Sequence, residues 1–457
     1  MRLVHVVFWI TFFPVLSACN LLPQRHIEEV GASVPDTWSA LNSYSQAIPE
    51  QWVDTFGDAQ LSRLVRNALD NNFELKAASA RVDAAVAQAR IEGSGRLPQV
   101  FFSADHQQVQ IRDAGFGSAR FGVFEALFGL TWEIDVWGRI RDSQHASIVE
   151  ADATHTDFYG AQLSLAARVA QSYFELTEAK LLASVIEQSI QDRTVIANLV
   201  RGRFHRGLVR GLDLRLALTD LANAEAQLQS TRNKIQKVTR RLEILMGRYP
   251  AGNEIVPTAL PRLSSTIPAG LPAELLGRRP DLVAAFSRLK AADLRTASAQ
   301  KLLLPRLTLT AAGGTRSPDL TELIDPRSVA WNVFSGMIQP VFTGGRILGE
   351  ISRNQAQAEA ALNHYKDTAL NAFREVEQAL SAEALLTQQE SYLENAVEQT
   401  ESSQKLAVYS YRNGLIEILT LLDSYRSTLN AQTAHLAVTR QLLSNRINLY
   451  LALGGHV

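Results

Sequence analysis

The chain repeats itself after 207 residues, and this duplication limits its possible folds more than any other feature of the sequence. Leu97-Pro98 recurs as Leu304-Pro305 (304 − 97 = 207), and the Gly and Pro residues that fix turns and element ends stay aligned without a gap. The other matching pairs are Arg81 and Arg288, Gly138-Arg139 and Gly345-Arg346, Gly207-Leu208 and Gly414-Leu415, and Gly247 and Gly454. We therefore expect two copies of one unit, at 58–247 and 267–454, joined by a linker at 248–266.

Each copy is expected to contain very long helices. Residues 58–91 are rich in Ala, Leu, Arg and Gln, and residues 139–204 contain no Pro and few Gly. At 1.5 Å per residue, a helix of about 65 residues makes a rod of about 100 Å. A turn at 207–211 then leads into a return helix, 212–246, of about half that length. Stacked on it end to end, the helix at 58–91 would supply the missing length, so each copy is predicted to be a long helical hairpin.

Each copy also contains two predicted strands, at 97–110 and 122–136 in the first copy and at 304–314 and 329–342 in the second. Within 124–136 apolar side chains alternate with Glu, Gly, Thr and Asp, and Leu127 is the one exception. This alternation predicts one apolar and one wet face. A soluble antiparallel sheet would show the same pattern. The length favours a transmembrane barrel strand, which needs about 9–11 such residues.

Four strands are too few to close a barrel, and an open sheet edge in lipid leaves backbone groups without partners. The strand count therefore predicts that at least two chains assemble, and we expect three. The fold class is accordingly mainly α with a small β part: helical hairpins forming an α-barrel, and four strands per chain contributing to a twelve-stranded β-barrel.

The N-terminus resembles a bacterial lipoprotein signal. Arg2 precedes an apolar stretch at 3–13 that is too short to span a membrane, and small residues lead up to Cys19. Cys19 is the only cysteine in the chain, which rules out an internal disulfide. We expect a signal peptide at 1–18, a lipid on Cys19 and an anchored segment at 19–57, with transfer to the outer membrane. The alternative is a buried free thiol beside an ordinary cleavage site.

Composition argues against several classes of function. The chain has 45 basic and 46 acidic side chains, whereas capture of nucleic acid calls for a basic excess. No apolar run reaches the roughly 18 residues of a spanning helix, so we expect strands to make any crossing of a membrane. Neither a nucleophile elbow, nor His-Glu-x-x-His, nor a cysteine cluster is present. We expect no enzyme, no metal and no cofactor beyond the covalent lipid.

Five segments at the ends of predicted elements have a pattern typical of one family. They are 132–139 (WEIDVWGR), 339–346 (QPVFTGGR), 278–282 (RRPDL), 375–380 (EVEQAL) and 450–455 (YLALGG). Together they resemble the TolC/OprM family of outer-membrane factors, specifically its lipoprotein, multidrug-efflux branch, from about Trp52 to the C-terminus. Three residues or pairs depart from the family pattern: Phe73 where proline is usual, Phe286 where Glu is usual, and Arg210-Gly211 at the first turn.

The resemblance implies a homotrimer in the outer membrane with a helical tunnel through the periplasm. It also implies docking to a periplasmic adaptor and to an inner-membrane pump, of the resistance-nodulation-division type, for which the chain would be a passive conduit for drugs or other small molecules. Two other interpretations stay open: the duct of a type I protein-secretion system, and a soluble coiled-coil scaffold.

The two turns are the first candidate site. Gly207-Leu208-Val209 and Gly414-Leu415-Ile416 are turns of a kind that needs glycine in any protein. An exposed apolar pair beside each turn would suit a partner contact. The family resemblance implies that these tips meet the adaptor.

The second candidate site is a periplasmic gate. Leu419 and Asp423 are spaced i, i+4, so they face one way on a helix and would form two rings in a symmetric trimer. An apolar ring can exclude water, and a carboxylate ring can bind cations. The resemblance implies a closed gate at these positions, with Tyr411 and Arg426 holding the neighbouring helices. The alternative is that Asp423 and Arg426 are an exposed pair that stabilises the helix by a few tenths of a kcal/mol.

Overall fold

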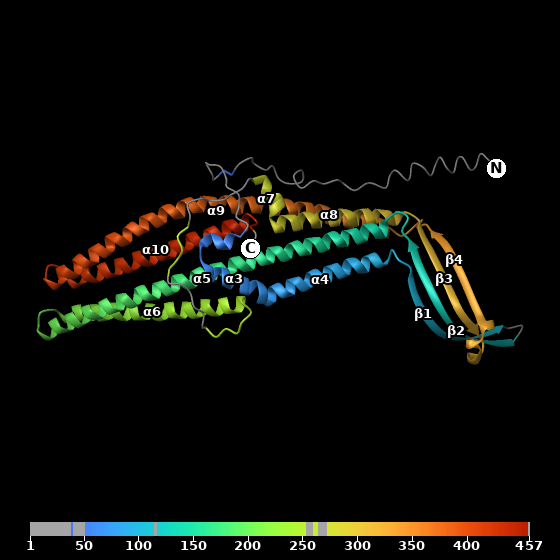
Figure 1. Cartoon of the computed structure of the whole chain (residues 1–457), viewed down its shortest axis with the longest axis horizontal. Helices are drawn as coiled ribbons and strands as arrows, with labels where there is room; N and C mark the ends of the chain where they lie inside the picture. The colour runs from blue at the N-terminus through green and yellow to red at the C-terminus, as the bar shows by residue number, and fades with distance from the viewer. Residues whose placement is uncertain (1–37, 40–50, 114–116, 253–258, 264–271, 456–457) are drawn as a thin grey trace. The chain divides into compact units, whose positions relative to one another are not determined.

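The computed structural model describes residues 38–39, 51–113, 117–252, 259–263 and 272–455. Helices dominate, and four strands form one sheet (Figure 1). The predicted signal peptide and Cys19 lie outside the described residues. The chain divides into two compact units. Within the described ranges, no helix combines the length and the apolar character that a membrane span requires.

The two copies contain the same long hairpin. Helices α5 (Arg139–His205) and α6 (Gly211–Leu245) form the first hairpin, and α9 (Arg346–Arg412) and α10 (Ile418–Ala452) form the second. The long helices have 67 residues each and the return helices 35 each. Every bound of the second hairpin lies 207 residues after its counterpart, which confirms the duplication and the long hairpins predicted from the sequence.

The single helix predicted at 58–91 is wrong, because the structure has two helices there. Helix α3 (Ala59–Asn71) ends at Asn72, whose ψ of 127° is extended, and α4 (Phe73–Ser94) follows. The second copy is interrupted at the equivalent point, between α7 (Pro272–Arg278) and α8 (Pro280–Gln300). A proline at position 280 accounts for the second break, but the first copy has no proline there.

Asn72 accounts for the first break. Its side-chain oxygen accepts a hydrogen bond from the backbone N–H of Leu75 at 2.9 Å, as an N-cap does. Its side-chain nitrogen donates to the carbonyl of Leu245 at 2.9 Å, at the end of α6. The return helix therefore ends against the junction of the two short helices. In the second copy, Arg279 at the corresponding junction donates to the carbonyl of Ala452 in α10 at 3.4 Å.

The first unit contains the sheet. Strands β1 (Gln99–Asp113), β2 (Gly117–Ile134), β3 (Arg306–Ser317) and β4 (Val329–Ile338) are antiparallel and lie in chain order. Strand β2 begins earlier than predicted, so most of the expected loop before it is paired with β1. Strand β4 ends earlier than predicted, before Pro340, which has no N–H to donate to a ladder.

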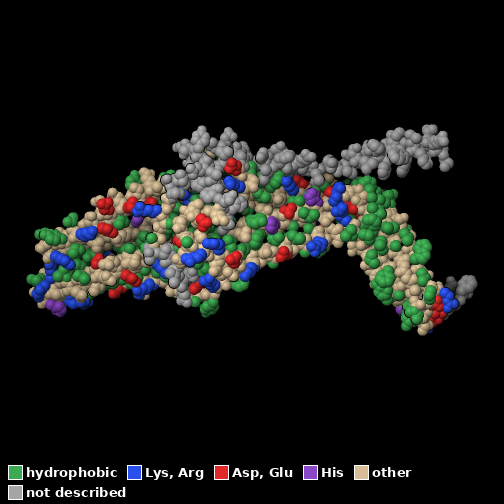
Figure 2. Space-filling view, in the orientation of Figure 1, with side chains coloured by type: hydrophobic (Ala, Val, Ile, Leu, Met, Phe, Trp, Pro, Cys, Tyr) green, Lys and Arg blue, Asp and Glu red, His purple; other side chains and the backbone are tan. Residues whose placement is uncertain are grey.

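The sheet has two unlike faces, as the alternation predicted. One face carries large apolar side chains that are exposed in the single chain, and Figure 2 shows hydrophobic side chains gathered over the strands. They include Val100, Phe102, Phe128, Trp331, Val333 and Met337. The opposite face mixes polar side chains with a few aromatic ones. We call these the apolar face and the polar face of the sheet.

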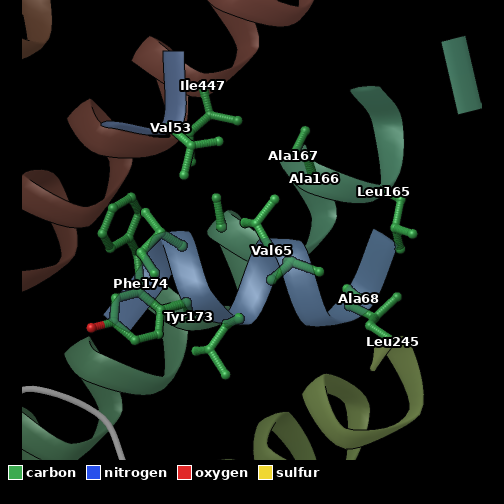
Figure 3. Packing of buried hydrophobic residues seen from close by; sticks show 14 of the residues in the cluster. Val53, Val65, Ala68, Leu165, Ala166, Ala167, Tyr173, Phe174, Leu245 and Ile447 are labelled. Atoms are coloured by element: carbon green, nitrogen blue, oxygen red, sulfur yellow. The ribbon is translucent and has the colours of Figure 1, made fainter. Parts of the chain in front are cut away.

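The second unit contains the largest core, part of which is drawn in Figure 3. A short 3-10 helix, η2 (Trp52–Phe56), inserts its aromatic side chains there, and Trp52 is fully buried and stacked on Tyr450 at 5.8 Å between ring centroids. Phe56 meets Phe174 of α5 edge to face at 5.2 Å. Through this helix, the segment that precedes the first copy packs against α10, the last helix of the second copy.

Candidate functional site

Each long helix ends in the same kind of tight turn. At the end of α5, Gly207 has a φ of +72°, and its N–H donates to the carbonyl of Phe204 at 2.9 Å. The N–H of Leu208 donates to the carbonyl of Arg203 at 3.0 Å. This pair of bonds is a Schellman cap, which needs the left-handed conformation that glycine adopts without strain.

The second turn repeats this geometry. Gly414 has a φ of +74°, and the N–H of Leu415 donates to the carbonyl of Ser410 at 2.9 Å. The apolar residues beside the two turns differ in exposure. Leu208 and Leu415 are 67% and 70% exposed, whereas Val209 and Ile416 pack on the cluster of buried side chains behind the tips. Of each predicted apolar pair, only the first residue is thus free to meet a partner.

Three of the four predicted gate residues share one exposed line on α10. Leu419 is 55% exposed, and Asp423 and Arg426 are exposed as well. Their spacing of i, i+4 and i+7 places them on one side of the helix. The opposite side of α10 is buried in the tip clusters through Leu421, Leu422, Tyr425 and Leu429. The line of three therefore makes no contribution to the core of its own chain.

Tyr411 lies apart from this line. It belongs to α9, is 4% exposed and packs in the core behind the tips. The guanidinium of Arg203, on α5, lies 5.0 Å from the centre of its ring. The same guanidinium donates to the carbonyls of Tyr411 and Arg412 at 3.2 and 2.8 Å. Burial raises the pKa of the Tyr411 hydroxyl, although the nearby Arg203 acts in the opposite direction, so the phenol is neutral at physiological pH.

A second arginine of α5 also reaches the second hairpin. Arg193 is 4% exposed, forms an ion pair with Asp220 of α6 at 2.6 Å, and places its guanidinium 5.5 Å from the ring centre of Tyr425 on α10. Sequence reasoning missed Arg193, Arg203 and Asp220. Nothing in the pattern of α5 separates these two arginines from its solvated ones. Together they attach both helices of the second hairpin to the first, close to the tips.

Two of the family-like motifs are element junctions. The carboxylate of Asp135 accepts from the backbone N–H groups of Ile140 and Arg141 at 3.1 and 2.7 Å, so it caps the start of α5 after β2. Arg279, between α7 and α8, forms ion pairs with Asp281 at 2.8 Å and with Glu375 at 2.6 Å. These residues of the two motifs therefore position helices.

Cys19, the predicted lipidation residue, lies outside the described residues. Among the residues that the structure does describe, no group of three His, Cys, Asp or Glu side chains comes together as metal ligands.

Two helical hairpins that are joined near their tips, a sheet with one apolar face and a duplicated chain define a class of protein: the long-hairpin channel subunit of the outer membrane. The family model for outer membrane efflux proteins matches the chain twice, over residues 64–248 and 271–455. The chain therefore belongs to the outer membrane efflux protein family, as the motifs predicted.

Individual relatives agree with this assignment. The chain is 31% identical over 442 residues to the pyoverdine export outer membrane protein OpmQ of Pseudomonas putida, and 93% of each chain is covered. It is 30% identical over 449 residues to the outer membrane protein OprJ of Pseudomonas aeruginosa, covering 96% of this chain and 93% of OprJ. The fold matches the solved outer-membrane channel OprN with a TM-score of 0.88 at 25% identity, over 96% of this chain and 99% of that one.

Proposed function

We propose that three copies of this chain form the outer-membrane duct of a tripartite efflux pump, anchored by a lipid on Cys19 and closed at its periplasmic end by α10. The two-faced sheet carries this proposal. Its apolar face exposes side chains such as Phe128 and Trp331, which are stable against lipid but costly in water. Its outer strands β1 and β4 each have an edge with no partner strand in the described part of the chain.

Pairing between chains would account for both the exposed apolar face and the unpaired strand edges. If β4 of one chain pairs with β1 of the next, the edges disappear and the apolar faces form one outward belt. Three chains supply twelve strands, enough to enclose an aqueous lumen lined by the polar faces. Two chains would supply eight strands, and side chains alone would nearly fill the interior of an eight-stranded barrel.

The gate follows from the same symmetry. Around a threefold axis, the exposed line of α10 becomes a ring of three Leu419 side chains and a ring of three Asp423 side chains. The leucines would exclude water and the carboxylates would hold cations in the closed state. Arg203 and Arg193 would keep the second hairpin against the first until a partner moves it.

The partners and the cargo are inferred from the exposed tips and from a relative. Leu208 and Leu415 protrude beside rigid turns, which suits contact with the helical hairpin of a periplasmic adaptor. An inner-membrane pump of the resistance-nodulation-division type would supply the energy. OpmQ is named for the export of one compound, pyoverdine, which favours small-molecule efflux over the secretion of a protein.

Single-channel recording tests the proposal. The full-length chain is inserted into a planar lipid bilayer, and the native protein is compared with Asp423→Ala. We expect rare, small openings in the native protein and frequent, larger ones in the variant. Glu417→Ala is the matched control, because Glu417 is an exposed carboxylate near the same tip but off the line of Leu419 and Asp423. An absence of channels would overturn the duct, and equal closure of native protein and Asp423→Ala would overturn the gate.

A further inference from the structure

We propose that Asp105, Glu125 and Arg316 form a charged row across three strands, which gives the lumen of the β-barrel a preference for cations. This inference rests on the proposed function, because it needs the polar face of the sheet to line a pore.

The strand register places the three residues in line. Asp105 of β1 is the Cα partner of Glu125 on β2, and Glu125 is the partner of Arg316 on β3. Side chains of directly paired residues point to the same face of a sheet. The neighbouring paired residues Ala104 and Ala126 belong to the apolar face, so the charged row lies on the polar face.

The row carries one uncompensated negative charge. The guanidinium of Arg316 lies 2.9 Å from the carboxylate of Glu125, and these two charges neutralise each other. Asp105 is exposed, and its carboxylate has neither a hydrogen bond nor an ion pair among the described residues.

The residues next to the row do not cancel this charge, and Arg306, an exposed cation of the same face, lies at the other end of β3. On the polar face, the row is flanked on one side by Ser103 and Leu127 and on the other by Gln107 and Val123, all of them neutral. The next carboxylate along β2 on this face, Glu133, is paired with Arg139 at 2.7 Å. Three chains would thus place three unpaired carboxylates at one level of the barrel.

A ring of carboxylates in a pore bounded by protein and lipid concentrates cations and repels anions. The row therefore acts as a filter of charge. It would favour cationic solutes and slow anionic ones after they have passed the gate. Because Glu125 already has a partner, Asp105 is the residue on which the preference depends.

Cysteine modification in the full-length chain tests this role. Asp105→Cys is made together with Leu419→Ala and Asp423→Ala, so that the gate does not dominate the measured selectivity. Reversal potentials in a KCl gradient give the ratio of K⁺ to Cl⁻ permeability. Each channel is then treated with a methanethiosulfonate that adds either a sulfonate or a trimethylammonium group. Ala104→Cys in the same background is the control, because Ala104 is the adjacent residue on the apolar face.

We expect Asp105→Cys to lower the permeability ratio by about twofold or more. The sulfonate should restore it, and the trimethylammonium should lower it further. Each channel is its own reference before and after treatment, so a folding defect cannot produce these opposite changes. Ala104→Cys should respond to neither reagent. The inference is overturned if Asp105→Cys channels conduct but the two reagents leave the ratio unchanged. A native chain that forms no channel would instead overturn the proposed function itself.

Discussion

Arg193 and Arg203 hold the two hairpins together near the tips, and Arg203 is the less buried of the two. Replacing it with Ala removes two hydrogen bonds to the carbonyls of Tyr411 and Arg412 and the contact with the Tyr411 ring. We expect the closed state to lose about 2 kcal/mol, because both bonds are made by a charged donor. Single-channel recording should then show a higher open probability for Arg203→Ala.

Arg201→Ala is the matched control for this variant. Arg201 is exposed on the same helix, and its guanidinium bonds to Asn198 within α5 at 2.7 Å. Its loss should leave the open probability unchanged. If Arg203→Ala gated like the native protein, the attachment of α9 to α5 would have no part in closure.

Asn72 makes a different kind of contribution, since it fixes where one helix ends and the next begins. Asn72→Ala removes the cap of α4 and leaves the buried carbonyl of Leu245 without its donor. We expect a loss of about 1–2 kcal/mol in the free energy of unfolding. Thermal unfolding followed by circular dichroism measures it. Asn71→Ala is the control, because the side chain of Asn71 is exposed and bonds only within its own helix. Equal melting temperatures for the two variants would contradict the capping role.

The sequence predicted some of these residues and missed others for a physical reason. The sequence could place Leu419 and Asp423 on one side of a helix because their spacing is local, and their role in a gate stays a prediction. Arg203 could not, because the carbonyls it binds lie more than 200 residues away in the chain. An arginine on a long helix looks the same in sequence whether it bonds to a distant backbone or to water.

At the scale of elements, a side chain at the glycine of either tip turn is expected to destabilise that turn. Gly207→Ala and Gly414→Ala would place a Cβ on a residue whose φ is +72° or +74°. We expect each change to destabilise its turn by about 1 kcal/mol, measured as a lower melting temperature. Gly202→Ala is the control, because Gly202 is helical and its added Cβ would meet no atom within 4 Å. That variant should be neutral or slightly stabilising. A lower melting temperature for Gly202→Ala alone would contradict this account.

Element bounds could be predicted where Gly or Pro marks them. The end of α5 agrees with prediction to within a residue, because a Schellman glycine follows it. The break before α4 was missed because an asparagine side chain, rather than proline, produces it. The early start of β2 was missed because the polar residues at its beginning resemble a loop, although β1 pairs with them.

At the scale of the whole molecule, duplication and divergence act on different levels. The backbone of the hairpins repeats with one constant offset, and both tips keep the same turn. The side chains around the tips do not repeat: Arg203 aligns with Ser410, and Asp423 aligns with Leu216. The copies are therefore alike in the residues that set helix length and unlike in the side chains around the tips. The architecture could thus be predicted from the repeat, whereas the arginine contacts between the hairpins could not, because they do not repeat.

If the barrel closes between chains, β1 of one chain lies beside β4 of another. Within one chain β1 and β4 are separated by two strands, or about 14 Å, which no disulfide can bridge. A disulfide between these strands must therefore join two chains. Ala104→Cys is combined in turn with Val329→Cys, Trp331→Cys and Val333→Cys, since all four positions lie on the apolar face and the register between chains is to be found. After oxidation in the membrane, denaturing gels should show a ladder that stops at three chains for at least one pair. Ala104→Cys alone should give no ladder, which excludes a contribution from Cys19. A ladder that stops at two chains, or no ladder for any of the three pairs, would contradict a twelve-stranded barrel.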